Sequence, residues 1–204
     1  MAGSKTQPPL TLDRVLTAAE DVVRRFGPDR ANVVDVARAL GVSHAAVYRH
    51  VASKAALRDR VVHRWVEAKM QPLRAIVAET GPAPERLRRF FDTLIAMKRR
   101  RAGEDPQLFA AYRTLAGDTP SVVAAHVDDL VNLGASIIRA GVQEGTFRPV
   151  EPVAAARAVL NATARFHHPA HVAEWGAPGI AEAFDGVWFL LMAGLVAEPA
   201  KPGR

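Results

Sequence analysis

The sequence predicts an all-α fold, and two observations carry this prediction. Apolar residues recur at steps of three and four along almost the whole chain, which is the spacing of one face of an α-helix. Glycine and proline interrupt this pattern at intervals of helix length, where helices end and begin. No segment shows the alternation of apolar and polar residues that indicates a strand. We therefore expect about nine helices and no sheet.

The composition is that of a folded, soluble protein with one large or two small domains. The chain has 204 residues, of which 49% are apolar and 24% are charged, and it contains no cysteine. The missing cysteines exclude a disulfide framework and a metal site with thiolate ligands. No run of about 18 consecutive apolar residues would span a membrane, and the polar segment Met1–Lys5 leads to no apolar signal core. We expect a cytoplasmic protein without a cofactor.

Positive charge is concentrated in the N-terminal third of the chain. Residues 1–70 contain 12 Lys and Arg against 7 Asp and Glu, whereas residues 71–204 contain 15 against 14. A basic region beside a nearly neutral remainder indicates a surface that binds a polyanion. By itself this imbalance favours nucleic-acid binding only weakly, since many solvated surfaces are basic.

The N-terminal part predicts short helices with clear end signals. The first helix covers Leu12–Phe26, where seven apolar residues form one stripe, and Gly27 followed by proline stops it. Asn32 is a good N-cap for a second helix. This helix ends at Gly41, because glycine easily adopts the positive φ of a helix C-terminus.

Further caps and breakers divide the rest of the chain. Ser43 caps a third helix over His44–His50, and Ser53 caps a long helix that runs from Lys54 to about Val77. Segments bounded by glycine or proline predict five more helices, over residues 85–101, 106–115, 120–145, 153–166 and 179–197. We expect the arm of residues 1–9 and the tail of residues 198–204 to be disordered.

The segment from Asn32 to Tyr48 has the make-up of a helix-turn-helix, in which two short helices meet at a tight turn. Gly41 stands at the pivot, and the small Ala37 lets the two helices cross closely. Four apolar residues can share one small core: Val36, Leu40, Val42 and Val47. The second helix keeps a surface without acidic residues, which suits contact with DNA.

The chain from Val36 to Leu57 resembles the signature of the TetR family of transcriptional regulators, roughly I-A-x-x-x-G-V-s-x-x-x-l-Y-x-H-F-x-s-K-x-x-L. It reads VARALGVSHAAVYRHVASKAAL without a gap, and the resemblance extends over residues 10–60. The resemblance implies a helix-turn-helix DNA-binding domain over residues 10–55. It also implies a helical effector-binding and dimerisation domain over residues 56–197.

Two positions depart from the family pattern. Val51 replaces the usual Phe, so the plug beneath the recognition helix is smaller, which costs about 1 kcal/mol of stability if the space is not refilled. Asn32 replaces the common Thr or Ser and exchanges one good cap for another. Neither departure undermines the expected DNA binding.

The resemblance and the residue chemistry together imply roles in DNA binding. Tyr48, His50 and Lys54 are expected to contact phosphates, Lys54 with the help of the N-terminal amides of its helix. Ala45 and its neighbours face the base edges, where a methyl group suits contact with thymine. For Arg49, a phosphate contact and simple exposure to solvent both stay open. The alternative that Tyr48 and His50 only pack the three-helix unit is disfavoured. The expected DNA-binding set is Asn32, Ser43, His44, Ala45, Ala46, Tyr48, Arg49, His50 and Lys54.

In TetR-like proteins the C-terminal helices dimerise and enclose an effector pocket. The segments 152–166 and 179–197 carry apolar stripes that, on this resemblance, form a four-helix bundle between two copies of the chain. The stripes alone fit a monomer core equally well. The expected pocket residues, for each of which core packing is the more common role, are Phe91, Leu94, Met97, Phe109, Tyr112, Arg113 and His126.

A cluster of histidines and a run of basic residues are not assigned a function. His167, His168 and His171 have a spacing that invites a metal site, but Pro169 interrupts the helix and no cysteine or paired carboxylate is near in sequence. A structured turn is therefore favoured. The basic run Lys98–Arg101 is interpreted as a solvated helix end that interacts with the helix dipole.

The sequence thus predicts a DNA-binding transcriptional regulator, most simply a repressor that a small-molecule effector releases from a palindromic operator. A helical enzyme that uses the histidines with Glu174 or Asp185 is disfavoured, because no nucleophile–base or metal pattern supports it. An architectural DNA-binding protein without an effector stays open, because the pocket is inferred from the resemblance alone.

Overall fold

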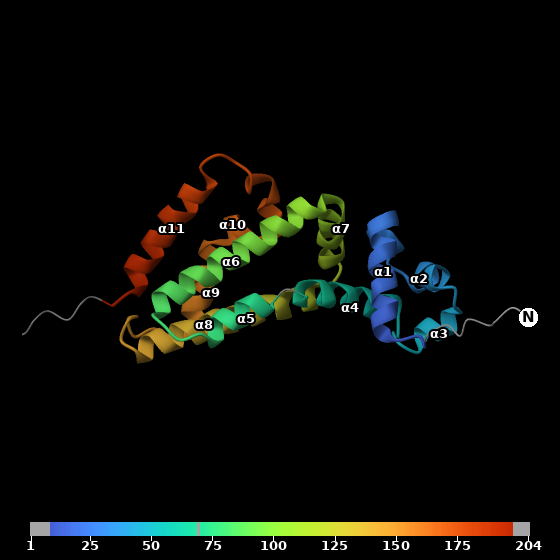
Figure 1. Ribbon diagram of the computed structural model, residues 1–204, viewed down its shortest axis with the longest axis horizontal. Helices are drawn as coiled ribbons and strands as arrows, with labels where there is room; N and C mark the ends of the chain where they lie inside the picture. The colour runs from blue at the N-terminus through green and yellow to red at the C-terminus, as the bar shows by residue number, and fades with distance from the viewer. Residues whose placement is uncertain (1–8, 69, 198–204) are drawn as a thin grey trace, which may run out of the picture. The chain divides into compact units, whose positions relative to one another are not determined.

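The computed structural model describes residues 9–68 and 70–197, and over these residues the chain is helical (Figure 1). Pro9 is the only residue of the expected arm that is described, and the expected tail lies outside the described residues. In chain order, the helices found over the described ranges are α1 Leu12–Phe26, η1 Pro28–Arg30, α2 Val33–Leu40, α3 His44–Tyr48, α4 Lys54–Glu67, α5 Gln71–Ala78, α6 Ala83–Glu104, α7 Pro106–Gly117, α8 Pro120–Gln143, α9 Pro152–Ala162, α10 Ala164–His167, η2 Pro169–Glu174 and α11 Ile180–Leu195.

The helices pack into two compact units. The first unit comprises the described residues up to Val66 together with Pro106–Val123, and the second comprises Glu67–Asp105 and the described residues from Ala124 on. These units cut the chain differently from the boundary at residues 55 and 56, because α4 and α7 add side chains to the N-terminal core. The division by function into residues 10–55 and 56–197 stays a prediction. The residues that α4 and α7 add are Leu57, Val61, Val62, Ala111, Tyr112 and Leu115.

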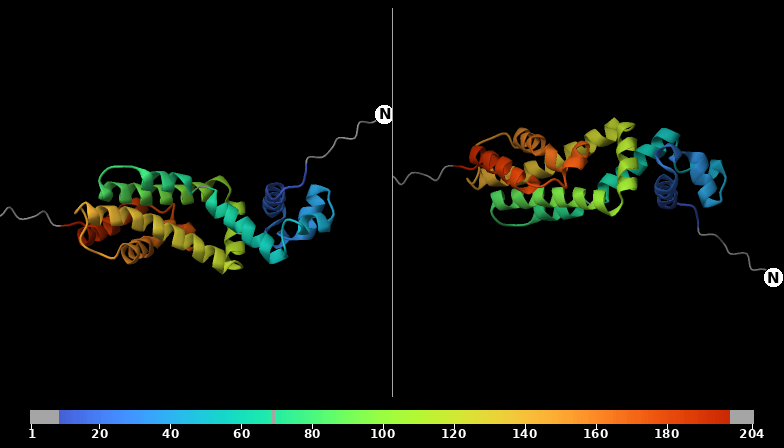
Figure 2. Two further views of the ribbon diagram at one scale, coloured as in Figure 1. Left: turned by 90° about the horizontal axis from the view of Figure 1, so that it is seen from below. Right: turned by 90° about the horizontal axis from the view of Figure 1, so that it is seen from above.

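Aromatic stacking joins α4 and α7 within the first unit. Trp65 of α4 stacks on Tyr112 of α7, with ring centroids 4.5 Å apart and an interplanar angle of 8°. Phe109, one turn earlier on α7, contacts the same indole at 5.8 Å between centroids. Aromatic pairs at such distances stabilise a fold beyond their buried area. This contact holds α7 in the unit that contains α1, α2 and α3, which lie together in both views of Figure 2.

The prediction of one long helix from Lys54 to Val77 is wrong, because α4 ends at Glu67 and α5 begins at Gln71. Pro72 stands in the first turn of α5. Proline has no N–H to donate to the preceding turn and its ring clashes with that turn, so it begins a helix far more easily than it continues one. An ion pair of 2.9 Å between Arg74 and Glu67 spans the break.

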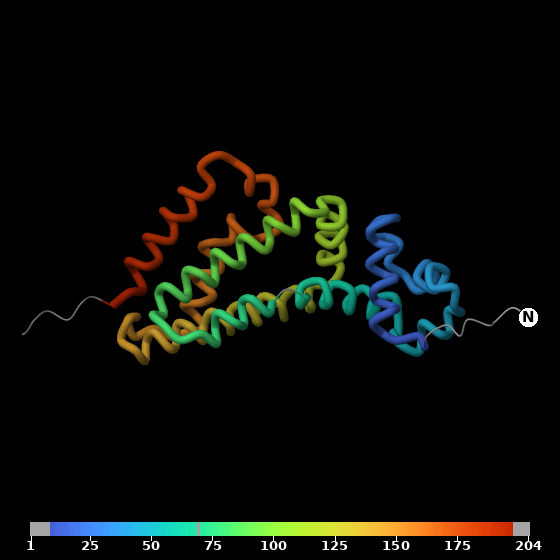
Figure 3. Tube along the Cα trace, viewed as in Figure 1, coloured from blue at the N-terminus to red at the C-terminus, as the bar shows by residue number. Residues whose placement is uncertain are grey.

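In the second unit, α5 and α6 form a hairpin of antiparallel helices, and Figure 3 follows the chain from one into the other. A buried arginine fixes this hairpin. Arg86 of α6 is only 6% exposed, and it donates hydrogen bonds to the carbonyl oxygens of Ile76 at 3.4 Å and Val77 at 2.7 Å. The carbonyl oxygen of Ile76 also accepts from the amide of the C-cap residue Glu79 at 3.4 Å, so the guanidinium adds to the capping of the last turn of α5.

Helix α8 crosses the core of the second unit. Among the described residues, it is the one helix long and apolar enough to cross a membrane by length and composition alone. Core helices of soluble proteins pass the same test, and α8 places Leu130, Val131, Ile137 and Ile138 in the core. We therefore interpret α8 as a core helix.

The helix expected over residues 153–166 is divided in two. Thr163 ends α9 and begins α10, and its hydroxyl donates to the carbonyl oxygen of Val159 at 2.8 Å. A threonine that bonds back to the preceding turn bends or interrupts a helix. The end of α11 is joined to the turn after α8 by an isolated antiparallel bridge between Phe147 and Val196.

A close approach between α8 and Phe147 requires glycine at position 141. A Cβ atom on Gly141 would lie 2.2 Å from Phe147 Cδ2 and 2.7 Å from Ala83 Cβ, and Phe147 itself is 2% exposed. The amides of Thr146 and Phe147 also bond to the carbonyl oxygen of Gly141, at 2.9 and 3.0 Å. The missing side chain is thus what lets the Phe147 ring fold back onto the helix.

Replacing Gly141 by Ala is expected to lower the free energy of unfolding by about 1–3 kcal/mol, because the neighbouring ring and methyl group must move aside. Gly134→Ala is the matched control on the same helix. Its Cβ would meet Ala156 Cβ at 3.5 Å, an ordinary contact, and alanine gains about 0.5–1 kcal/mol in a helix interior. Urea denaturation measures both changes. Equal stabilities of the two variants would contradict this interpretation.

Candidate nucleic-acid interface

The turn between α2 and α3 is built as a helix-turn-helix. Gly41 ends α2 with φ 66° and ψ 32°, the left-handed conformation that glycine adopts without strain, and its amide and that of Val42 satisfy the last carbonyls of α2. Asn32 caps α2 by accepting from the amide of Asp35 at 2.9 Å. Ser43 caps α3 by accepting from the amide of Ala46 at 3.2 Å. The predicted caps and pivot are confirmed.

A small apolar core holds the two helices on α1. Val36, Ala37 and Val47 are fully buried, and Val51 is 2% exposed. These four residues belong to one cluster with Val15 and Ala19 of α1, and Leu40 and Val42 pack against it. The smaller Val51 thus fills its position without being exposed. Since one side of α3 packs into this core, its other side faces outward.

The outward side of α3 carries most of the predicted DNA-contacting residues. Tyr48 is 52% exposed, and His44, Ala45 and Arg49 are exposed as well. Ala46 does not belong with them: it is 9% exposed and packs inward, so only Ala45 offers a methyl group on this face. Position 46 differs from position 45 by about 100° around a helix, which moves its side chain off the exposed face.

The helix α3 ends earlier than expected, at Tyr48, and Arg49 forms its C-cap. His50 is half-buried in the turn that follows, and its amide bonds to the carbonyl oxygen of Val47 at 2.9 Å. Ser53 then accepts from the amide of Ala56 at 3.0 Å, so that α4 begins with the exposed Lys54. An ammonium group in the first turn of a helix lies beside free backbone amides, a combination that binds phosphate oxygens.

Acidic charge near this face is neutralised by neighbouring arginines. Asp35 of α2 lies 3.4 Å from Arg30 and 2.9 Å from Arg38. The hydrogen bond from the Asn32 side chain, at 2.7 Å, and then Arg30 lower the pKa of Asp35 below its ordinary value. The side chain of Asn32 is therefore engaged with Asp35 on both its oxygen and its nitrogen. Its backbone amide is engaged as well, donating to the carbonyl oxygen of Arg30 at 2.7 Å. A phosphate contact from the backbone or the side chain of Asn32 stays a prediction.

Two arginines of α4 join this helix to the elements around the helix-turn-helix. Arg64 lies 3.0 Å from Asp13 and 3.3 Å from Glu20 of α1, where burial raises the pKa of Glu20 and the charge of Arg64 partly opposes the rise. Arg58 donates to the carbonyl oxygen of Ala31 at 3.4 Å and to Asp118 at 2.7 Å. The start of α4, including Lys54, is thus fixed relative to α2 and α3.

This arrangement defines a helix-turn-helix protein: a short helix with an exposed, acid-free face, fixed by a turn at glycine and followed by a cation at a helix N-terminus. The described fold pairs this element with a separate helical unit. Such an exposed helix fits the major groove of DNA, and the flanking groups fit the phosphates.

Comparison with known families identifies the protein group. Residues 15–61 match the family model described as "Bacterial regulatory proteins, tetR family", and residues 83–188 match "Tetracyclin repressor-like, C-terminal domain". Together these matches cover more than half of the chain. The chain belongs to the TetR family.

Individual relatives and solved structures agree with this assignment. An uncharacterised HTH-type transcriptional regulator of Mycobacterium tuberculosis is 28% identical over 129 residues, which are 63% of this chain and 62% of that protein. The structure of SmeT, the repressor of the Stenotrophomonas maltophilia multidrug efflux pump SmeDEF, has a TM-score of 0.64 and 20% identity, with 95% of this chain and 94% of that chain covered. A regulator from Saccharomonospora viridis in complex with choline has a TM-score of 0.59 and 19% identity, with 92% and 98% covered. At these identities the solved structures establish the fold.

The residues expected in an effector pocket are divided between the two compact units. Phe91, Leu94 and His126 are buried in the second unit and Met97 is half-buried there. Phe109 and Tyr112 are buried in the first unit, where both contact Trp65, and Arg113 is exposed. A role in effector binding stays a prediction for all seven.

The three C-terminal histidines have three separate environments. His167 is 6% exposed, and its Nε2 lies 3.2 Å from the Thr163 hydroxyl. His168 accepts from the amide of Ala170 at 3.2 Å and so caps η2, while His171 lies 2.8 Å from Glu174. Within the described ranges, no three His, Cys, Asp or Glu side chains are grouped so that they could hold a metal ion.

The environment of His167 predicts a pH dependence of stability. Burial, followed by the charge of Lys98, lowers its pKa from 6.5 to about 4. Because the unfolded chain binds a proton below pH 6.5 and the folded one does not until about pH 4, the folded state should lose up to about 3 kcal/mol as the pH falls through this range. Urea denaturation between pH 4.5 and 7 measures this slope.

His167→Gln should flatten the slope, whereas His63→Gln, at an exposed histidine of α4, should leave it unchanged. If the parent and the His167 variant lost stability in parallel, His167 would not be the group that titrates.

Proposed function

We propose that this chain is a transcriptional repressor that binds a palindromic operator as a homodimer and leaves it when a small-molecule effector binds. The observation that carries the proposal is the exposed face of α3 with Tyr48 at its end, held by a core that contains Val36, Ala37 and Val47. The chain spans 62% of the length of the mycobacterial regulator that it matches. The proposed activity of this chain therefore rests on this site and on membership of the TetR family. A protein of this kind acts in the cytoplasm, where the chromosome is.

In the proposed complex α3 enters the major groove. His44 and Ala45 meet base edges, where the imidazole can donate or accept and the methyl group suits thymine. Tyr48, His50 and Lys54 contact phosphates on either side, which fixes the register of the helix on the duplex. Arg49, exposed at the C-cap of α3, is placed to reach a phosphate as well.

The proposed dimer forms through residues 152–166 and 179–197. On α11, Phe189 and Leu190 are each 71% exposed, although both are large apolar side chains. They extend an apolar helix in which Phe184 and Trp188 already serve the core of the chain itself. A second copy packed on this helix would remove both side chains from water, and a two-fold dimer would present two α3 helices to two operator half-sites.

An effector is supported by the family match of residues 83–188 and by the similar fold of the regulator solved with choline. The choline belongs to that protein, and the effector of this chain is a separate question. The mycobacterial relative and SmeT are transcriptional regulators, which favours a binding function over catalysis.

Replacing Tyr48 or Lys54 by Ala should weaken operator binding about tenfold or more, since each removes a hydrogen bond or ion pair to a phosphate in both half-sites. Lys54→Ala should also reduce the slope of log K against log salt by about one for each phosphate that the lysine no longer neutralises. The operator is obtained by selecting bound fragments from genomic DNA, and fluorescence anisotropy at several salt concentrations measures both effects.

Arg60→Ala is the matched control for Lys54→Ala, because it removes the same charge from an exposed position of the same helix. It lies more than a turn further along α4 and on a different side. Operator binding by the Tyr48 and Lys54 variants at the level of the parent would refute the assigned interface.

Phe189→Glu and Leu190→Glu should convert the dimer into a monomer, because a charge would then have to be buried between the two copies. Light scattering coupled to gel filtration measures the mass, with twice the chain mass expected for the parent. Val34→Glu, at another exposed apolar residue that lies on α2, should remain dimeric. Dimers formed by both α11 variants would place the interface elsewhere.

A further inference from the structure

The side chains that α3 offers to DNA include few that form hydrogen bonds with bases. The segment Ser43–Arg49, which comprises α3 and its two caps, reads SHAAVYR and contains no Asn, Gln, Asp, Glu or Lys. In the major groove, Arg or Lys pairs with guanine through two hydrogen bonds, and Asn or Gln pairs with adenine in the same way. Arg49 at the C-cap is therefore the one residue of this segment whose type forms such a double contact.

Polar groups next to α3 are engaged within the protein itself. The Ser43 hydroxyl oxygen accepts from the amide of Ala46 at 3.2 Å and so caps α3. The side chain of Asn32 donates to the Asp35 carboxylate at 2.7 Å and accepts from the Asp35 amide at 2.9 Å. Arg38 pairs with the same carboxylate at 2.9 Å. The amide and the guanidinium that α2 and its N-cap carry are thus held by Asp35.

Ala45 lies near the middle of the exposed face and in the first turn of α3. Successive residues of an α-helix are rotated by about 100°. Over an arc of about 140°, the exposed side chains therefore follow in the order His44, Tyr48, Ala45 and Arg49. A recognition helix brings its N-terminal residues to the base edges. In the proposed complex Ala45 thus approaches a base, while Tyr48, at the other end of the helix, reaches a phosphate.

The side chain of Ala45 is a single methyl group without a hydrogen-bonding atom. A base can contact it only by coming close to the helix and by presenting an apolar group. In unmodified DNA, the C5-methyl group of thymine is the apolar group that a base presents in the major groove. Contact between the two methyl groups removes both from water, which favours binding. Ala46 adds no second methyl group, because it is 9% exposed and packs inward.

We infer that Ala45 recognises the C5-methyl group of one pyrimidine in each operator half-site, and that this contact, rather than a hydrogen bond, specifies that base pair. The pyrimidine is thymine in unmodified DNA, and 5-methylcytosine carries the same group at the same place in the groove. This inference rests on the proposed function, because it names the chemical group that the proposed interface reads. DNA without the methyl group keeps its phosphate contacts and loses this part of the preference for the operator.

Uracil differs from thymine only in lacking this methyl group. The operator fragment from the genomic selection is therefore resynthesised with uracil in place of thymine, at one pair of symmetric positions at a time. Fluorescence anisotropy measures the dissociation constant of the full chain for each duplex. We expect one pair of positions at which uracil weakens binding about fifteenfold, or about fourfold for each half-site, which corresponds to the loss of one buried methyl contact in each.

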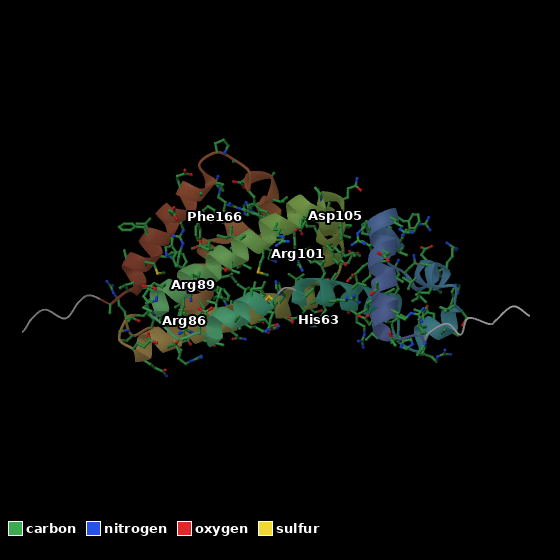
Figure 4. The ribbon with its side chains drawn as sticks, in the orientation of Figure 1. His63, Arg86, Arg89, Arg101, Asp105 and Phe166 are labelled. Atoms are coloured by element: carbon green, nitrogen blue, oxygen red, sulfur yellow. The ribbon has the colours of Figure 1, made fainter. Side chains whose placement is uncertain are left out.

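Ala45→Gly removes the methyl group from the protein, so this variant should bind the thymine and uracil duplexes equally at those positions. Ala39→Gly, the same substitution at an exposed position of α2, is the matched control and should keep the preference of the parent for thymine. His63→Ala, at an exposed position of α4 that is labelled in Figure 4, should keep it as well. The uracil scan on the parent tests the inference even if glycine at position 45 destabilises α3.

A second pair of bases separates the methyl group from the hydrogen-bonding groups of the base. At the identified positions, 5-methylcytosine should bind more tightly than cytosine, since the two differ only in the methyl group and both pair with guanine. Selection from amplified DNA, which carries no methylated cytosine, that returns the same operator with thymine assigns the group to thymine. A site with cytosine there that is recovered only from native genomic DNA assigns it to 5-methylcytosine.

Two results would overturn the inference. One is a uracil scan without effect at every thymine of the operator, and the other is a loss of affinity on uracil substitution that is as large in Ala45→Gly as in the parent. Both leave the proposed function intact, because the parent still binds its operator. Failure of the parent to bind any operator fragment would instead contradict the proposed function, and this inference with it.

Discussion

The left-handed turn at Gly41 is the constraint on which the candidate interface depends. It reverses the chain within a few residues, so that α2 and α3 can bury Val36, Ala37 and Val47 against α1. Since this core takes one side of α3, the other side, with Tyr48, is left in solvent. A side chain at Gly41 would meet no neighbouring atom, so the constraint is one of backbone conformation rather than of space.

Long polar side chains then fix the elements that carry the flanking contacts. Arg64 and Arg58 connect α4 to α1, to the segment before α2 and to the turn after α7. These groups are partly exposed, so each ion pair contributes modestly to stability. Their structural effect is larger, because they hold the N-terminus of α4 and Lys54 in place beside α3. The stacking of Trp65 on Tyr112 brings α7 into the same unit.

The second unit combines an apolar core with basic side chains that are buried or half-buried beside it. Arg86 is buried with its donors directed at the carbonyl oxygens of Ile76 and Val77, so its hydrogen-bonding capacity is used within the fold. Lys98 lies in the same helix and is half-buried near the positive charge of Arg101. Phe189 and Leu190 of α11 form an apolar face that packing within one chain leaves exposed to solvent.

Local patterns in the sequence determined most of the helix-turn-helix. The caps Asn32 and Ser43, the pivot Gly41 and the bounds of α1 follow from residue types at fixed spacing, because capping and positive φ are properties of a few neighbouring residues. The break before Pro72 is marked locally by the proline itself. The prediction missed it because the apolar periodicity continues across the break. The break at Thr163 depends on a hydroxyl bonding back to the preceding turn, and that choice is made by packing.

Tertiary structure alone decided which side chains of a helix face inward and which elements share a core. Ala45 and Ala46 are the same residue type, and only the packing of α3 on its neighbours leaves one in solvent and buries the other. The membership of α7 in the first unit and the burial of Lys98 in the second have the same origin. Each depends on packing between residues far apart in the chain, which local periodicity cannot specify.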